Sequence, residues 1–136
     1  MEETDKAYIA GFIDGEGYIG ITRQERENRP TMSYRTILTI SNTKIEALKF
    51  CEKFYGGRIR IEANTFRWYC PSANQERLLL DILPYLKLKQ KNAILVIDYK
   101  SYLGEATKEN LQIRENFWKA IKEFNRNKFK EDSKCL

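Results

Sequence analysis

The stretch Ile9-Ala-Gly-Phe-Ile-Asp-Gly-Glu-Gly17 marks the point where the sequence changes from a helical to a strand pattern. From Thr4 to about Asp14 apolar residues recur at helical spacing. After the glycines, apolar and polar residues alternate from Tyr18 onward. The sequence therefore predicts a helix that runs directly into a half-buried strand. The apolar stripe of this helix, expected to face a core, consists of Tyr8, Ile9, Phe12 and Ile13.

A second stripe of the same helix is made almost wholly of small residues, namely Ala7, Ala10, Gly11 and Asp14. Small residues let backbones approach closely, and a glycine inside a water-exposed helix is less favourable than alanine by about 1 kcal/mol. Spacing alone leaves two explanations open. The stripe packs against another helix, or the helix simply lies against its own sheet.

The rest of the chain predicts three more strands and four more helices. Strand-like alternation covers 34–41, 58–63 and 66–70, and the polar segment 24–32 with Pro30 is typical of a hairpin connection. Helical spacing covers 43–55, where Thr43 and Glu46 have capping-box spacing, then 72–86, 91–102 and 111–124. The order α-ββ-α-ββ-α-α-α indicates an α+β fold. One four-stranded antiparallel sheet would carry helices on its apolar face and leave the other face open.

Length and termini favour one soluble unit. The 136 residues match the size of one domain, so we expect a single domain over residues 1–127 and a polar, frayed tail over residues 128–136. The acidic segment 1–5 lacks the positive charge of a signal peptide, and no apolar run approaches the length of a membrane span. We therefore expect a protein that is not secreted and has no membrane partner.

Composition narrows the chemistry. Lys and Arg outnumber Asp and Glu by 24 to 19, which favours a polyanionic partner. Three cysteines without CxxC spacing indicate neither a disulfide framework nor a zinc site, and fit a reducing intracellular compartment. The chain has no histidine, which excludes Ser-His-Asp and Cys-His hydrolysis. Any catalysis is left to carboxylates, lysines and a bound metal.

The open face of the expected sheet collects Arg, amide and hydroxyl groups, which suit phosphates and base edges. A plain solvated face is the alternative, but it gives no reason for so many arginines. The expected DNA-contacting residues are Thr22, Gln24, Arg26, Arg35, Thr39, Ser41, Arg58, Arg60, Glu62, Arg67 and Tyr69.

The nine residues from Ile9 to Gly17 resemble the signature that names the LAGLIDADG homing endonucleases. The Ala-Gly pair, the aspartate, the final carboxylate and the terminal glycine are all kept, at a helix-to-strand junction and within the αββαββ order of that family. A second segment, Leu83-Pro-Tyr-Leu-Lys-Leu-Lys-Gln-Lys91, resembles the basic P-x-L-x-x-K stretch after the family's third helix. The resemblance covers about residues 5–125.

Only one copy of the signature is present, whereas two-motif members of the family hold both halves in one chain. The resemblance therefore implies a homodimer, in which the stripe Ala7, Ala10, Gly11 and Asp14 pairs with the same helix of a second copy. The two Glu16 side chains would then meet near the two-fold axis. The expected target is an approximately palindromic site in double-stranded DNA, with bases read by Gln24, Arg35, Arg58 and Arg60.

The resemblance also implies a metal-dependent double-strand break, in which water attacks one phosphodiester in each strand. Glu16 is expected to hold Mg²⁺, with the Gly15 carbonyl as companion ligand and Mn²⁺ able to substitute.

Two lysines complete the expected catalytic set. Lys89 aligns with the family's basic residue that stabilises charge on the phosphate, and Lys44 matches a polar member of the pocket by spacing. A further basic position of the family falls here on apolar Leu48, with Lys49 adjacent, in an ungapped match.

Other function classes stay open at this point. The same scaffold serves maturases that bind intron RNA and regulators that bind DNA without cutting it, although the retained Glu16 argues for cutting. Tight binding of intron RNA without cleavage would favour the maturase. A plain protein-interaction domain would show no salt-dependent affinity for nucleic acid.

Overall fold

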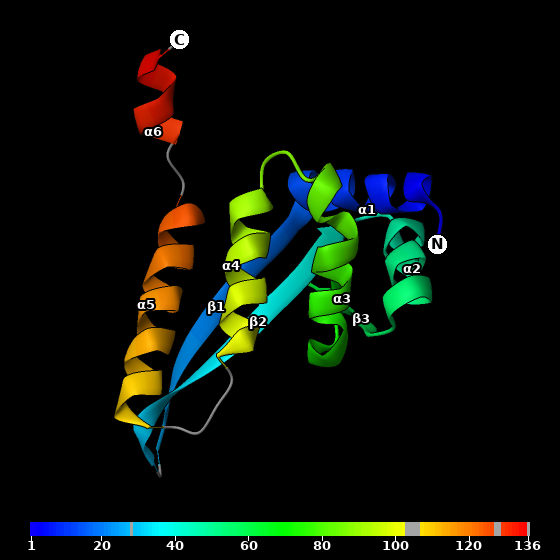
Figure 1. Ribbon diagram of the computed structural model, residues 1–136. Coiled ribbons are helices and arrows are strands. Elements are labelled where there is room, and N and C mark those ends of the chain that lie inside the picture. The colour runs from blue at the N-terminus through cyan, green and yellow to red at the C-terminus, as the bar shows by residue number, and fades with distance from the viewer. Residues whose placement is uncertain (28, 103–106, 127–128, 136) are drawn as a thin grey trace.

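The predicted α+β class and αββαββ order are confirmed by a computed structural model (Figure 1). The structure describes all residues except 28, 103–106, 127–128 and 136, and the side chains of residues 26 and 29–31 also lie outside that description. The elements are α1 (Glu3–Glu16), β1 (Gly17–Arg26), β2 (Arg29–Asn42), α2 (Ile45–Tyr55), β3 (Arg58–Glu62), β4 (Thr65–Tyr69), α3 (Ser72–Ile82), a 3₁₀ turn η1 (Leu83–Tyr85), α4 (Gln90–Ser101), α5 (Lys108–Phe124), α6 (Phe129–Asp132) and η2 (Ser133–Cys135).

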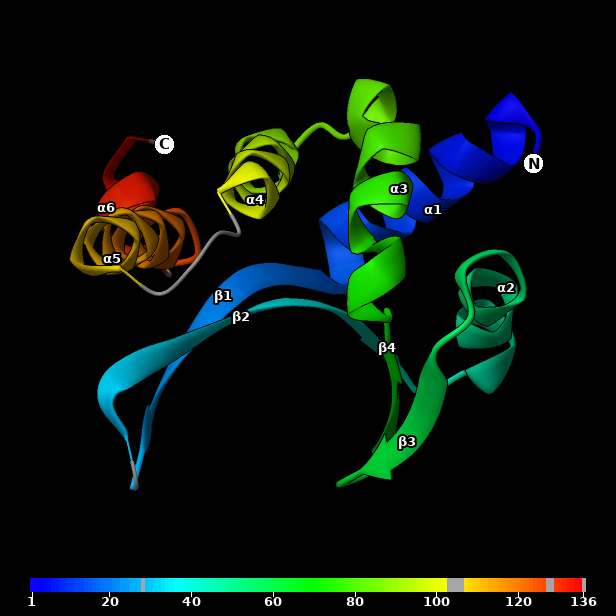
Figure 2. The same cartoon turned by 60° about the horizontal axis from the view of Figure 1, so that its bottom comes forward.

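The sheet is antiparallel with strand order β1-β2-β4-β3. Figure 2 shows it as an arch, with the helices on the convex side and the concave side uncovered. The register pairs Ile19 with Leu38 and Ile40 with Trp68, so apolar residues share the helix-covered face. All four of these side chains are buried. The alternation expected from the sequence therefore separates a core face from an open face.

The junction of α1 and β1 requires a glycine. A Cβ on Gly17 would lie 2.9 Å from both the Cα and the carbonyl oxygen of Ile13, closer than real Cβ contacts. The helix can therefore stop and the strand can begin without a loop, because Gly17 lets the chain fold back on the last turn.

The two stripes of α1 do not divide as the sequence suggested. Ile9 and Ile13 are buried as expected, but Tyr8 is 51% exposed and stands edge-on to Phe50 of α2. In the small-residue stripe, Ala10 has no exposed surface, whereas Ala7 and Gly11 are exposed. Part of the stripe therefore packs on the protein's own core, and part of it is open.

Two local expectations are corrected. The helix expected over 72–86 is interrupted at Ile82, because Pro84 has no N–H to donate and the chain tightens into η1. Thr43 does not cap α2, which begins after Lys44, and Asn42 Oδ1 instead accepts a 2.7 Å bond from the Lys44 N–H. The end of the chain forms α6 and η2, whose described residues are all exposed, and its fraying stays a prediction.

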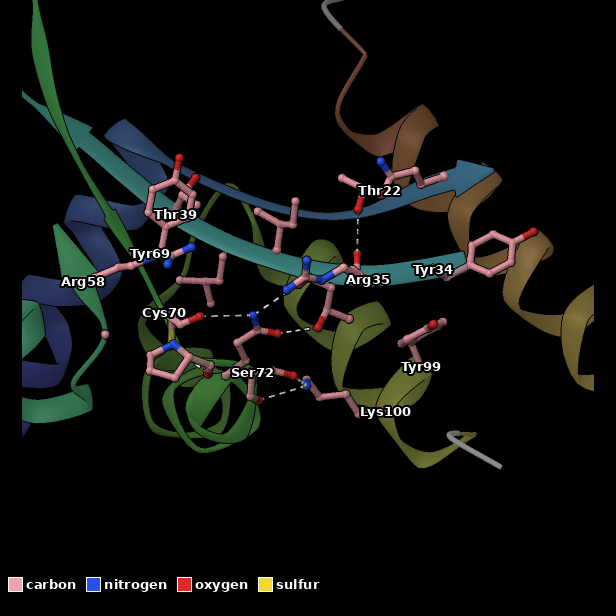
Figure 3. Close-up of a pocket in the computed structure, with 17 residues that line it drawn as sticks. Thr22, Tyr34, Arg35, Thr39, Arg58, Tyr69, Cys70, Ser72, Tyr99 and Lys100 are labelled. Carbon is pink, nitrogen blue, oxygen red and sulfur yellow. Dashed lines mark hydrogen bonds between the residues drawn. The ribbon is translucent and has the colours of Figure 1, made fainter. Parts of the chain in front are cut away.

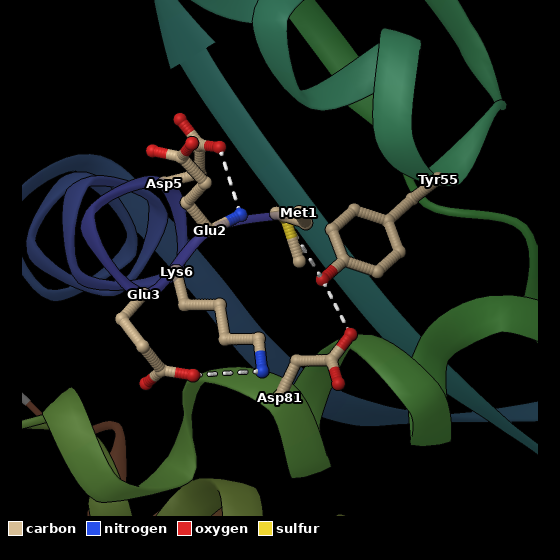
Figure 4. A network of polar contacts seen from close by, with 7 residues as sticks. All are labelled: Met1, Glu2, Glu3, Asp5, Lys6, Tyr55 and Asp81. Carbon is tan, nitrogen blue, oxygen red and sulfur yellow. Dashed lines mark hydrogen bonds and ion pairs between the residues drawn. The ribbon is translucent and has the colours of Figure 1, made fainter.

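Tyr55 at the end of α2 contacts α3 and Met1, which precedes α1 (Figure 4). Its hydroxyl donates a 2.7 Å hydrogen bond to Asp81 Oδ2 of α3, and Met1 Sδ lies 3.8 Å from the same oxygen. Burial and the Asp81 carboxylate raise the pKa of Tyr55 above its ordinary value. The contact fixes α2 to α3. No helix in the described part of the chain is long and apolar enough to cross a membrane.

Candidate functional site

The C-terminal end of α1 exposes an uncompensated acid. Gly15 and Glu16 are both exposed, and the Glu16 carboxylate makes no hydrogen bond or ion pair with any residue that the structure describes. The last carbonyls of a helix carry partial negative charge, and α1 has no basic residue in its last turn. A carboxylate beside such a helix end is attractive to a cation.

The oxygen ligands at the end of α1 fit Mg²⁺ only together with further ligands from outside this chain. The described residues contain no group of three acidic, cysteine or histidine side chains that could hold a metal ion. Mg²⁺ is usually bound through one or two carboxylates together with waters and substrate phosphates. Glu16 and the Gly15 carbonyl supply that protein share, and leave the remaining positions to water, phosphate or a second chain.

Lys89 lies at the same helix end. Its Nζ donates a 2.6 Å hydrogen bond to the backbone carbonyl of Asp14, two residues before Glu16. The Asp14 carboxylate accepts the backbone N–H groups of Lys87 at 2.6 Å, Leu88 at 3.2 Å and Lys89 at 3.0 Å. The structure therefore brings the basic segment before α4 against the end of α1.

Asp14 is mostly covered. Only 9% of the residue is exposed, and its carboxylate is occupied within its own chain, so little of its surface is open to a second copy of α1.

Lys44 lies between the end of β2 and the start of α2, near the junction of α1 and β1. Gly17, the first residue of β1, pairs with Ile40, so the end of β2 and the start of α2 run past the end of α1. The Lys44 side chain is exposed there. Leu48 is buried in the core and Lys49 beside it is exposed, so no basic group occupies the Leu48 position.

The other predicted contact residues share the concave face. The register aligns Thr22 with Arg35 and Ser41 with Arg67, and Arg60 with Arg67 across β3 and β4. Alternation from these pairs carries the rest of the set to the same side. The members so placed are Thr22, Gln24, Arg35, Thr39, Ser41, Arg58, Arg60, Glu62, Arg67 and Tyr69. Arg26 ends β1, and its side chain lies outside the described part.

Some of these side chains are already engaged. Arg67 forms an ion pair with Glu62 at 3.2 Å and donates to Ser41 Oγ at 2.9 Å, and the Tyr69 hydroxyl bonds to Glu62. Arg58 stands 5.6 Å from the centre of the Tyr69 ring. These contacts hold the β3–β4 hairpin in shape. Arg35, Arg58 and Arg60 are exposed and form no ion pair with another described residue.

Thr39 is mostly covered. It is 6% exposed, and the register puts it between Tyr18 on β1 and Tyr69 on β4, of which Figure 3 shows Tyr69 beside it. Little of Thr39 is therefore open to a ligand, and more of the two tyrosines is exposed. Tyr18 is not among the predicted contact residues, although alternation puts it outward. Its ring covers Gly20, where an added Cβ would lie 2.5 Å from the ring.

A hollow of about 710 Å³ opens where β2 and β4 diverge (Figure 3). Arg35 and Arg58 line it from the sheet, and Lys100 lines it from α4. Lys100 Nζ donates to the Ser72 carbonyl at 3.1 Å, and burial lowers the pKa of Lys100. The lining includes neither Glu16 nor Lys89, so this hollow is separate from the α1 end. Sequence periodicity gave no signal for Lys100, because its neighbours there come from other elements.

Comparison with known proteins agrees with this geometry. The family model described as LAGLIDADG endonuclease matches residues 9–106, most of the chain. A search of curated proteins found no significant match.

Solved structures share the fold. The homing endonuclease I-CvuI, solved in complex with the I-CreI target, is 23% identical with a TM-score of 0.84, over 92% of this chain and 84% of that one. The archaeal intron-encoded homing endonuclease I-Vdi141I, solved with DNA, is 16% identical with a TM-score of 0.82, over 93% and 87%. The meganuclease I-AabMI, solved with uncleaved DNA, is 17% identical with a TM-score of 0.72, over 88% of this chain but 46% of that one.

Proposed function

The chain belongs to the LAGLIDADG endonuclease family as a single-motif member, and on that premise we propose that it cuts double-stranded DNA as a homodimer. The observation that carries this proposal is the Glu16 carboxylate, which is exposed at the end of α1 and has no partner in the described part of its own chain. The target is a long pseudo-palindromic site, because a two-fold protein presents two equivalent surfaces.

The division of labour follows from where the side chains lie. Glu16 and the Gly15 carbonyl would hold a divalent cation, Mg²⁺ or Mn²⁺, which would supply charge stabilisation and an activated water near the scissile phosphate. Lys89 offers an ammonium group at the same helix end, suited to the negative charge that grows on the phosphate. Lys44 supplies a further exposed cation near the junction.

Binding rests on the concave face. Arg35, Arg58 and Arg60 are exposed there, and their guanidinium groups suit phosphates and guanine edges. The affinity should fall steeply with salt, because every phosphate neutralised releases counterions. Two copies joined near their α1 ends would present two such faces to one duplex. Ala7 and Gly11 offer the exposed small surface for that contact.

The test is cleavage of a randomised DNA library with Mg²⁺, using wild-type protein and the Glu16→Gln variant. The substitution removes the charge at little steric change, so we expect cutting to fall by about 10³-fold or more, while binding changes by less than about threefold. Glu76→Gln, an exposed acid on α3, is the matched control and should cut normally. Full cutting by Glu16→Gln would refute the assignment.

A second readout separates the alternatives. If wild-type protein cuts no library member but binds intron RNA tightly, the maturase function replaces this one. Salt-sensitive DNA binding without cutting would identify a non-cleaving regulator.

A further inference from the structure

We propose that Asp14 is a positioning residue, which holds Lys89 in a fixed relation to Glu16. This inference rests on the proposed function, since it assigns Asp14 a task within the same site. Asp14 acts through Lys89 and has no contact with DNA in this account.

The first argument is the number of bonds that one carboxylate accepts. Three consecutive backbone N–H groups, from Lys87 to Lys89, donate to the two oxygens of Asp14 at 2.6 to 3.2 Å. Hydrogen bonds to an ionised acceptor are stronger than neutral ones. The backbone of this segment is thereby fixed to α1 at successive residues.

The second argument is that apolar burial does not anchor the segment. Leu86 is the last buried residue before α4, and Leu88 is 75% exposed. Apolar burial therefore cannot hold residues 87–89 in place. The start of α4 holds only the last of them, since the Lys89 carbonyl accepts the Ala93 N–H at 3.0 Å, and Asp14 supplies the contacts to all three N–H groups.

The third argument is a bond in the opposite direction. Lys89 Nζ donates at 2.6 Å to the carbonyl of Asp14 itself. Asp14 thus contacts Lys89 twice. Its carboxylate accepts the Lys89 backbone N–H, and its backbone carbonyl accepts the Lys89 ammonium group. Glu16 follows two residues later on the same helix, so both expected catalytic groups are carried by one rigid unit.

The experiment is a double-mutant cycle on single-turnover cleavage with Asp14→Asn and Lys89→Met. An amide in place of the carboxylate has one acceptor oxygen instead of two. We expect Asp14→Asn to slow cutting about 10- to 100-fold, as is typical when a residue supporting a catalytic group is changed. In the Lys89→Met background the same change should slow cutting less than about threefold.

The control is Asp81→Asn, which breaks a carboxylate contact on the other side of the helical layer. Its effect on cutting should be the same in both backgrounds. If the fold-losses in cleavage rate from Asp14→Asn and Lys89→Met multiply in full in the double variant, the proposal is overturned. A general loss of stability predicts that result. Asp14→Glu keeps the charge and should recover part of the rate.

Amide hydrogen exchange tests the positioning without depending on cleavage activity. Amide hydrogen exchange on the wild-type protein should show Lys87, Leu88 and Lys89 protected despite their exposure, and fast exchange there would overturn the inference. If the wild type cuts no DNA but these amides are protected and become exposed in Asp14→Asn, the proposed function fails while the positioning stands.

Discussion

Two glutamates, Glu16 at the end of α1 and Glu115 of α5 against the β1–β2 hairpin, have contrasting surroundings. Glu115 of α5 is bonded on both oxygens, to Arg23 Nη1 at 2.6 Å and to the hydroxyl of Tyr34. The Trp118 ring covers Arg23 at 4.1 Å. Glu16 is exposed and has no such partner among the described residues. The paired acid joins α5 to the β1–β2 hairpin, and the other acid has no contact within the described part of its own chain.

Tyr34, which is bonded to Glu115, has a raised pKa. Burial, followed by the hydrogen bond and the charge of Glu115, raises the pKa of Tyr34 to about 12. Tyr34 is therefore a neutral donor throughout the ordinary pH range, and its own ionisation does not break the contact between α5 and the hairpin below about pH 10.

The largest effect is expected where a second copy would complete the site around Glu16. A Cβ on Gly11 would meet nothing within 4 Å, so Gly11→Leu should leave the protomer folded. It should block close approach of a second α1. We expect dimer dissociation to become easier by about 100-fold or more, and cutting to be lost at nanomolar protein.

Analytical ultracentrifugation and the cleavage assay check this prediction. Ala73→Leu, an exposed small-to-large change on α3, is the matched control and should dimerise normally. A Gly11→Leu protein that dimerises as tightly as the wild type would move the interface away from α1.

The next effect separates the two glutamates directly. Glu115→Gln removes the charge from a half-buried contact with Arg23, and should lower the free energy of unfolding by about 2 kcal/mol. Glu16→Gln should change it by less than about 0.5 kcal/mol, since no contact within the described chain is lost. Urea denaturation of both variants measures the difference. Equal losses of stability would break the comparison.

The sequence predicted the two faces of the sheet better than the contacts at the end of α1. Alternation in 18–24 and 34–41 assigned each side chain to a face, because a strand repeats every two residues and local pattern suffices. The contact of Asp14 with residues 87–89 could not be read this way, since it joins segments 73 to 75 positions apart. The cover over Thr39 was hidden for the same reason, because Tyr69 reaches it from another strand.

A smaller effect is expected at the contact between α2 and α3. Tyr55→Phe removes the hydroxyl that donates to Asp81, and should lower the free energy of unfolding by about 1 kcal/mol. Tyr102→Phe is the control, because Tyr102 is half exposed, and should be neutral. Urea denaturation checks both. A neutral Tyr55→Phe would show that packing of the ring, rather than its hydroxyl, fixes the two helices.

The smallest effect concerns the two buried thiols. Burial raises the pKa of Cys51 and of Cys70 to about 12, whereas Cys135 is exposed. A raised pKa favours folding fully below about pH 9, and that contribution is lost as pH rises towards 12. In native protein at pH 8, one thiol per chain should react rapidly with a disulfide reagent, and the Cys135→Ser variant should lose that fast phase.

The remaining two thiols should react only as fast as the protein opens, since their thiolate fraction is small and their access is blocked. Adding urea below the unfolding midpoint should speed that slow phase and leave the fast phase unchanged. Rapid reaction of a second thiol in native protein would mean that the core beneath α2 and β4 opens independently. The rigid scaffold around the accessible Glu16 would then be limited to a smaller part of the molecule.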